Sequence, residues 1–321
     1  MSVYTTVEAE QLAQFLRRYE LGKALDFKPI VAGITNTNYF LDTEQGSFVL
    51  TLYEHHSDDE IEYMLKLQQH LADRAVRCSQ PVRDRRGDFY SSLNNRPAAI
   101  IQRLPGEVES APDLAQCALI GVELARFHLA GMDFGGDRAN PRGLDWIVAV
   151  RDMLNDNLDD TDQQAIEATL VAAQRANLEA LPHGAIHADL FHDNALFSGD
   201  ALGGILDFDY ACSDSFAFDI AVLLNDWCID ESYQLIADRV SVVLEAYQRL
   251  RPLEADETDA LPILLRISAL RFWLSRLYDR AFPLSGDLTF TKSPDTFREM
   301  HRLRSTQSIV PGLADPVPRT G

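Results

Sequence analysis

Apolar and polar positions follow two periods along this chain, which separate a strand-rich first part from a mainly helical second part. Apolar side chains recur every three or four positions between residues 12 and 19, which predicts a helix over about residues 7–19. Thr5 and Glu8 stand three positions apart at its start and fit a capping box. The same spacing predicts a second helix over residues 59–71.

Short apolar runs between and after these helices predict strands. The runs at residues 39–42 and 47–52 flank a turn, and a further buried strand is predicted at residues 98–101. A proline and a glycine at positions 105 and 106 then break the pattern. We therefore predict a small strand-rich lobe over residues 1–104 and a larger, mainly helical lobe over residues 105–321.

One segment of the second lobe carries a chemical pattern. His187, Asp189 and Asn194 stand in the spacing HxDxxxxN, with a short apolar run on either side. The glycines of residues 199–204 predict a hairpin turn, after which another apolar run leads into Asp207. We expect a strand, a polar loop, a strand, a turn and a strand ending in an aspartate, in that order.

This order suits phosphoryl transfer from ATP. Asp189 would orient and deprotonate an attacking hydroxyl, while Asn194 and Asp207 would hold Mg²⁺ against the phosphates. Two protein oxygens are enough, because Mg²⁺ keeps several of its waters. We expect His187 to orient the loop through hydrogen bonds rather than to exchange a proton. A rival hypothesis, a metal-hydrolase site of His187, Asp189 and His192, requires a second cluster of histidines and carboxylates nearby.

The composition narrows the possible partners. The 321 residues carry a formal net charge of −20, which argues against nucleic acids and anionic membranes. The sequence lacks a run of about 18 apolar residues that would span a membrane. The four cysteines are scattered without CxxC pairs, so we expect reduced thiols in a cytoplasmic protein rather than disulfides or a zinc site. The oligomeric state does not follow from any of these patterns.

The turn at residues 33–38 lies between two predicted strands, where a loop covering a nucleotide would lie. It holds a single glycine, so it matches neither GxGxxG nor a Walker A loop. Its threonine and asparagine side chains are candidates for phosphate contacts, although a polar hairpin turn is the simpler interpretation. The candidate nucleotide-binding residues are Gly33, Thr35, Asn36, Asn38, Gln102 and Leu104.

Together these motifs resemble the kinase-like small-molecule phosphotransferases that include aminoglycoside phosphotransferases and choline kinases. The pattern of that family is HxDxxxxN followed by an acidic-aromatic-acidic triplet, here DFD at residues 207–209. The likeness covers nearly the whole chain, including ELARFHLAG at residues 123–131 and a helix start in which Asp219 would brace the catalytic loop. It implies a two-lobed, protein-kinase-like α+β fold with a nucleotide-binding N-terminal lobe, a catalytic and substrate-binding C-terminal lobe, and ATP and Mg²⁺ as cofactors.

Three further segments resemble the branch of that family that acts on L-homoserine. They are GITNTNYF at residues 33–40, FVLTLYE at residues 48–54 and ALRFWLSRLYD at residues 269–279. This likeness implies the formation of O-phospho-L-homoserine, a step of threonine biosynthesis. Two alternatives stay open: a kinase for another amino alcohol or an aminoglycoside, and a catalytically weak nucleotide-binding regulator.

An amino-acid acceptor needs an anion for its ammonium group and a cation for its carboxylate. Asp209 is the candidate for the ammonium group. The candidates for the carboxylate are Arg271, Arg276 and Lys292. A solvated, salt-bridged helix face is the simpler interpretation of any single arginine in that region.

One position departs from the family pattern. Thr51 stands where kinases of this fold carry a strand lysine that pairs with a helix carboxylate. Without that cation, the charge of the phosphates is less well neutralised. Glu60 and Glu62 are the candidates for the helix carboxylate, although two solvated side chains are at least as good an interpretation.

Overall fold

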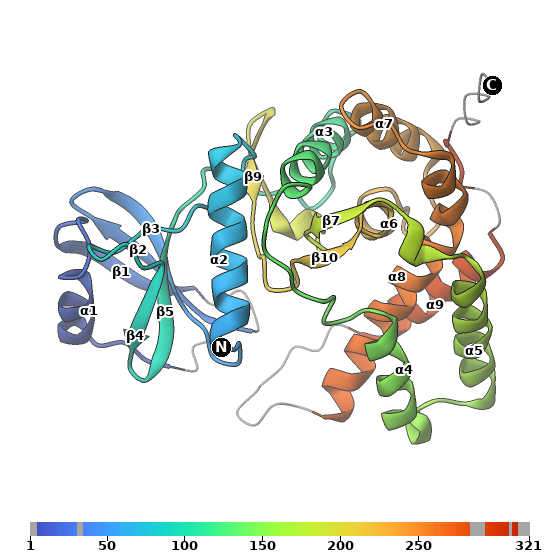
Figure 1. Cartoon of the computed structure of the whole chain (residues 1–321), viewed down its shortest axis with the longest axis horizontal. Coiled ribbons are helices and arrows are strands. Elements are labelled where there is room, and N and C mark those ends of the chain that lie inside the picture. Colours follow the sequence, from blue (N-terminus) through green and yellow to red (C-terminus); the bar gives the residue numbers. More distant parts are fainter. Residues whose placement is uncertain (1–4, 31–34, 283–292, 308–309, 314–321) are drawn as a thin grey trace. The chain divides into compact units, whose positions relative to one another are not determined.

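The computed structural model describes residues 5–30, 35–282, 293–307 and 310–313. These residues form two compact units, of which the first ends at Pro105 and the second begins at Gly106 (Figure 1). The first unit is built on one antiparallel sheet and the second is mainly helical, which confirms the predicted α+β class. Two candidate site residues, Gly33 and Lys292, lie outside the described ranges.

A five-stranded sheet with strand order β1-β2-β3-β5-β4 forms the first unit. Alternate residues of β2 are buried, because successive side chains of a strand point to opposite faces of the sheet. The elements of this unit are α1 (Ala9–Leu16), β1 (Ala24–Ile30), β2 (Thr37–Thr43), β3 (Gly46–Leu52), α2 (Asp58–Asp73), β4 (Tyr90–Leu93) and β5 (Arg96–Gln102).

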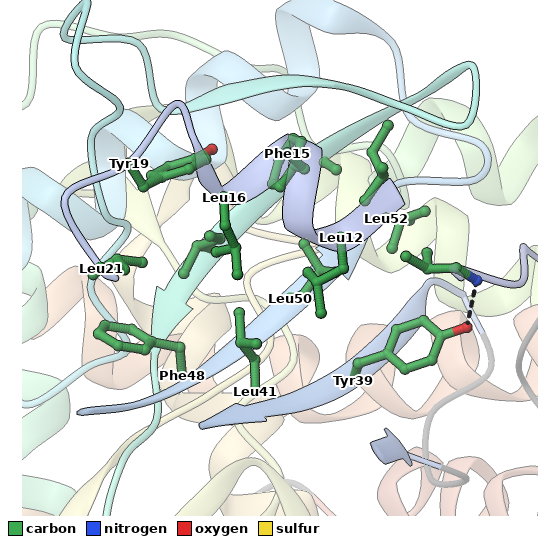
Figure 2. Close-up of a cluster of buried hydrophobic side chains, with 14 residues drawn as sticks. Leu12, Phe15, Leu16, Tyr19, Leu21, Tyr39, Leu41, Phe48, Leu50 and Leu52 are labelled. Carbon is green, nitrogen blue, oxygen red and sulfur yellow. Dashed lines mark hydrogen bonds between the residues drawn. The ribbon is translucent and has the colours of Figure 1, made fainter. Parts of the chain in front are cut away.

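The helix α1 covers the sheet through an apolar cluster. Figure 2 shows Leu12 and Phe15 of the helix packed against Leu41 and Leu50 of the strands, and all four side chains are buried. This contact removes the apolar stripe of the helix from water, which is the main reason that so short a helix is stable here.

The start of α1 differs from the prediction. The helix begins at Ala9, and its capping box joins Glu8 to Gln11 rather than Thr5 to Glu8. The hydroxyl of Thr5 donates instead to the buried carboxylate of Glu54, at 3.1 Å. This tertiary contact draws the threonine away from the helix end, so the local capping signal was misleading.

The second unit combines helices with two small sheets. β7 pairs with β10, while β8 pairs with both β6 and β9. The helix α3 packs along α7, and α8 packs against α6 and α9. The elements are β6 (Glu107–Val108), α3 (Leu114–Gly131), α4 (Leu144–Met153), α5 (Asp160–Arg175), β7 (His183–Ile186), β8 (Ala195–Ser198), β9 (Ala201–Ile205), β10 (Cys212–Ser215), α6 (Phe216–Trp227), α7 (Ala237–Gln248), α8 (Ala255–Ala281) and α9 (Asp295–Ser305), with short 3₁₀ turns at Asn155–Asn157, Leu178–Ala180 and His192–Asn194.

The hairpin after the catalytic segment turns at Gly199 and Asp200, within the predicted range. Gly203 and Gly204 were wrongly included in the turn, since both lie inside β9. The register between β8 and β9 shifts beside Leu196, and Gly204 has a φ of +150°. A bulge accounts for a glycine within the strand, because the distorted backbone there disfavours a side chain.

Two simple features complete the fold. Across the described ranges, none of the helices combines the length and apolar character that crossing a membrane requires. The four cysteines are all free and buried, as expected for reduced thiols.

Candidate active site

The predicted catalytic loop follows β7 in the second unit and is bound by a side chain of the helix α6. The carboxylate of Asp219 accepts the backbone N–H groups of His187 and Ala188, each at 2.8 Å. Ala188 has a φ of +61°, a conformation that costs free energy for a residue with a side chain. The two hydrogen bonds stabilise this conformation, and they confirm that Asp219 braces the loop.

His187 is fully buried, and both of its ring nitrogens are engaged. Nε2 donates to the carbonyl of Leu206 at 2.8 Å, and Nδ1 accepts the backbone N–H of Asp189 at 3.2 Å. Burial lowers the pKa of His187 below its ordinary value. The ring is therefore neutral near pH 7, and it ties the catalytic loop to the strand end that precedes Asp207.

Asn194 closes the other end of the loop. Its Nδ2 donates to the backbone carbonyl of Asp189 at 2.8 Å and lies 3.4 Å from the Asp189 carboxylate. The backbone carbonyl of Asn194 accepts from Leu206 at 2.9 Å. The side-chain Oδ1 of Asn194 forms no hydrogen bond with another described residue, which leaves the type of oxygen that a hard cation binds.

Asp207 and Asp209 follow at the end of β9. The backbone N–H of Asp209 donates to the Asp207 carboxylate at 3.2 Å, and Asp207 has a φ of +60°. The protein atoms packed around the Asp207 carboxyl and the nearby Asp209 charge raise its pKa to about 7. Two carboxylates that repel each other form a pair that a cation would stabilise, and the backbone of Asn194 pairs with Leu206, directly before Asp207.

The donor set fits Mg²⁺ completed by phosphates and water, and not a metal held by protein alone. No group of three or more His, Cys, Asp or Glu side chains in the described part of the chain is placed to hold a metal ion. His192 is directed instead to Asp226, with Nδ1 and a carboxylate oxygen 2.8 Å apart. The metal-hydrolase hypothesis is therefore wrong.

The predicted carboxylate-binding cations lie in different surroundings. Arg271 is only 1% exposed, donates to the carbonyl of Ala188 and lies 3.7 Å from the Asp189 carboxylate. Arg276 stacks on Phe297 at 4.1 Å and donates to the carbonyl of residue 293 at 3.2 Å. Arg271 is thus not part of a solvated helix face, because it supports the catalytic loop from within.

The first unit separates the candidate nucleotide-binding residues into two places. Asn38 accepts the Thr51 hydroxyl at 2.7 Å, and these residues face each other across β2 and β3. Asn36 is buried and Thr35 half-buried at the start of β2. Gln102 pairs with Phe48, three residues along β3 from Thr51, and the half-buried Leu104 follows it. Asn38 lies on β2 and Gln102 on β5, on either side of β3. The two groups are therefore roughly 10 Å apart along the strands and roughly another 10 Å apart across the sheet.

Thr51, at the position of the strand lysine, and the two candidate helix carboxylates Glu60 and Glu62 all form local contacts. Thr51 is bound by Asn38. Glu60 completes a capping box with Ser57, and Glu62 pairs with Lys66 one turn along α2. Both contacts are local to α2, and a role of either carboxylate at the nucleotide stays a prediction.

Two residues beside the site were missed in the sequence. Arg138 donates to the backbone carbonyls of Asp209 and Ala211, at 2.8 and 2.9 Å, and so fixes the chain after the acidic pair. Arg142 lies over the ring of Trp146 at 4.3 Å and reaches Tyr210. Their position in an irregular segment some 50 residues upstream gives no spacing that would link them to the loop.

A small antiparallel sheet unit followed by a helical unit that carries this loop defines a kinase-like phosphotransferase. The sequence matches the phosphotransferase enzyme family over residues 26–253, and the chain belongs to that family. It is 43% identical to a protein of Methylobacillus flagellatus named homoserine kinase, over 97% of this chain and 98% of that protein. A homoserine kinase of Rhodopseudomonas palustris is 44% identical over 96% of this chain and 95% of its own.

Solved structures share the same fold at lower identity. An amicoumacin kinase, determined with AMP-PNP and Ca²⁺, matches with a TM-score of 0.70 and 18% identity over 93% of this chain and 92% of its own. A microcompartment-associated aminopropanol kinase matches with a TM-score of 0.65 and 18% identity, over 93% and 94% of the two chains. These likenesses establish the kinase-like fold and leave the acceptor to be inferred otherwise.

Proposed function

We propose that this protein transfers the γ-phosphoryl group of ATP to the side-chain hydroxyl of L-homoserine, with Mg²⁺ as cofactor. The observation that carries the proposal is the similarity to proteins named homoserine kinase, between 40% and 44% identical over nearly the full length of both chains. The product would be O-phospho-L-homoserine, an intermediate of threonine biosynthesis. The four buried, reduced thiols suit an enzyme of the cytoplasm.

The residues of the loop have different roles in this reaction. Asp189 accepts the hydrogen bond of the attacking hydroxyl and takes its proton, while His187 keeps the loop in place. Asn194 and Asp207 would hold Mg²⁺, which neutralises the charge of the phosphates. Asp209, beside them, binds the ammonium group of the acceptor.

The nucleotide would contact the first unit. We assign its phosphates to the turn with Gly33, Thr35, Asn36 and Asn38, and another part of the molecule to Gln102 and Leu104. The separation of these two groups along β3 supports contacts with different ends of one nucleotide.

An ADP-release assay with four acceptors tests the proposal. L-Homoserine should support turnover, whereas choline, ethanolamine and kanamycin should not. Preferential turnover of kanamycin would disprove the homoserine assignment and keep the phosphotransferase assignment. A lack of turnover with every acceptor, despite ATP binding, would favour a nucleotide-binding regulator.

A further inference from the structure

Two guanidinium groups lie near one tyrosine ring beside the catalytic loop. Arg271 lies 4.9 Å from the centre of the Tyr210 ring, and Arg142 lies 5.9 Å from it. Arg271 is also 3.7 Å from the Asp189 carboxylate. Arg142 and Arg271 thus share Tyr210 as a neighbour, and Arg271 in turn lies beside Asp189, the predicted base. All these residues belong to the second unit.

The two arginines differ in what they can offer a ligand. Arg271 is buried and already donates to the carbonyl of Ala188, so little of its guanidinium is open to an acceptor. Arg142 is only half-buried, just before α4. Its guanidinium stacks on Trp146 at 4.3 Å and lies 6.0 Å from the ring of Tyr278. Stacking occupies the face of a guanidinium, and one part of the Arg142 edge interacts with the Tyr210 hydroxyl. The other N–H groups of this edge remain available for a carboxylate.

The charge of Arg142 is also uncompensated. Among the residues that the structure describes, it forms no ion pair within 4 Å with any carboxylate, in contrast to Arg151 further along α4. The charge of Arg142 acts on Asp279, whose pKa is raised by burial and lowered by Arg142. On the other side, Arg142 and Arg271 repel each other, since the charge of Arg142 adds to burial in lowering the pKa of Arg271. An anion near Arg142 would relieve this repulsion.

From this geometry we infer that Arg142 binds the α-carboxylate of the acceptor and is the residue that selects an amino acid over an amino alcohol. The inference rests on the proposed function. The carboxylate and hydroxyl of L-homoserine stand at opposite ends of a short carbon chain, roughly 5 Å apart. The charges of Asp189 and Arg142 both act on the Tyr210 phenol. An acceptor that binds Asp189 through its hydroxyl and lies along this ring would place its carboxylate near Arg142. Neither Arg276, which is stacked on Phe297, nor Lys292 is needed for this contact.

The test compares L-homoserine with 3-aminopropan-1-ol, which is the same molecule without its carboxylate. In Arg142→Met, kcat/KM for L-homoserine should fall about 10- to 100-fold, the range expected for a charged hydrogen bond. For 3-aminopropan-1-ol, either kcat/KM or, if it is not turned over, its inhibition constant against L-homoserine should stay within about threefold of the parent value. The KM for ATP should also stay within about threefold. If Arg142 had only a structural role, its replacement would impair the use or binding of both acceptors to the same extent. That result would overturn the inference.

A matched control removes a positive charge from α4, the helix that follows Arg142. Arg151→Met, on the surface of α4 beside Asp152 and Glu167, should leave every constant unchanged. If Arg142→Met does not fold, Arg142→Lys keeps the charge and loses the planar fork, and it should still reduce the preference for L-homoserine over 3-aminopropan-1-ol. An unchanged preference in both foldable variants would refute the inference and leave the proposed function intact. If the parent enzyme itself fails to use L-homoserine, the proposed function and the inference both fall.

Discussion

The carboxylate of Asp219 accepts the backbone N–H of Ala188 at 2.8 Å and so holds a residue whose φ is +61°. Asp219 also receives the backbone N–H of His187 and lies 3.1 Å from Nε2 of His128. One buried carboxylate therefore keeps the start of the catalytic loop in a conformation that the chain would not adopt alone.

Asp219→Asn should damage catalysis by releasing this loop. The amide offers one acceptor oxygen in place of two, so at least one buried N–H loses its partner, at a cost of about 1–3 kcal/mol. We expect a lower kcat with a nearly unchanged KM for ATP, and a lower thermal midpoint. Asp200→Asn, in the exposed hairpin turn, is the control and should change neither. A normal kcat in Asp219→Asn would show that the loop holds its shape without the brace.

Asp189→Asn should lower turnover by about a hundredfold or more, because a positioned general base is lost. The affinity for ATP should hardly change, since Asp189 is assigned to the acceptor. Steady-state kinetics and ATP titration measure the two quantities separately. Turnover close to that of the parent would mean that another group takes the proton.

Asp207→Ala should abolish activity and the Mg²⁺-dependent increase in ATP affinity, while the protein remains folded. Removing the divalent cation with EDTA should have the same effect on the parent protein and none on the variant. Calorimetric titration of ATP with and without Mg²⁺ measures this. Equal affinities for Mg-ATP in the variant and the parent would reject Asp207 as a metal ligand.

Much of this site followed from local sequence, because its groups are close along the chain. The segment from His187 to Asp207 spans one loop and one hairpin. The spacing of its residues along the sequence therefore largely determines how they are arranged in space. The strand β10 was missed because its sequence, CSDS, is polar and short. It is a strand only because β7, far back in the chain, supplies the partner.

The cations of the site were predicted less well, for a different reason. An arginine in a helix is usually solvated, so the burial of Arg271 could not be expected from its neighbours. It is buried because the second unit packs α8 under the catalytic loop, a long-range contact with Ala188. Arg142 was missed for the same reason, because only the fold brings it close to Tyr210.

Acid should destabilise the second unit through His301. This ring is buried, lies 2.8 Å from the Thr169 hydroxyl, and has its pKa lowered to about 3 by burial and by the nearby Arg266 charge. Below the ordinary histidine pKa of about 6.5, the unfolded chain binds a proton that the folded protein does not. The stabilisation is therefore complete above that pH and is lost as the pH falls toward 3.

Between pH 6.5 and 4.5 this single group should reduce the free energy of unfolding by roughly 2–3 kcal/mol. Urea unfolding at several pH values measures the slope, and His301→Gln should flatten it. An identical slope in the parent and the variant would assign the acid sensitivity to other groups.

Gly121→Ala should destabilise the contact between α3 and α7. A Cβ at this position would lie 2.6 Å from the backbone carbonyl of Val243, which cannot move as a side chain can. We expect a loss of about 1–3 kcal/mol in the free energy of unfolding. Gly135→Ala is the matched control, because its Cβ would meet nothing within 4 Å and should leave stability unchanged or slightly higher. Equal effects of the two substitutions would contradict the close approach.

The burial of the cysteines has a practical consequence. Burial raises the pKa of Cys117 to about 11 and also raises those of Cys212 and Cys228. Because the thiolate is the form that alkylating reagents attack, the folded protein should react with iodoacetamide only when it opens. Cys78 belongs to the first unit and the other three to the second. The rate at which each cysteine is labelled would therefore report how often each unit opens by itself, with and without ATP, in the protein without substitutions.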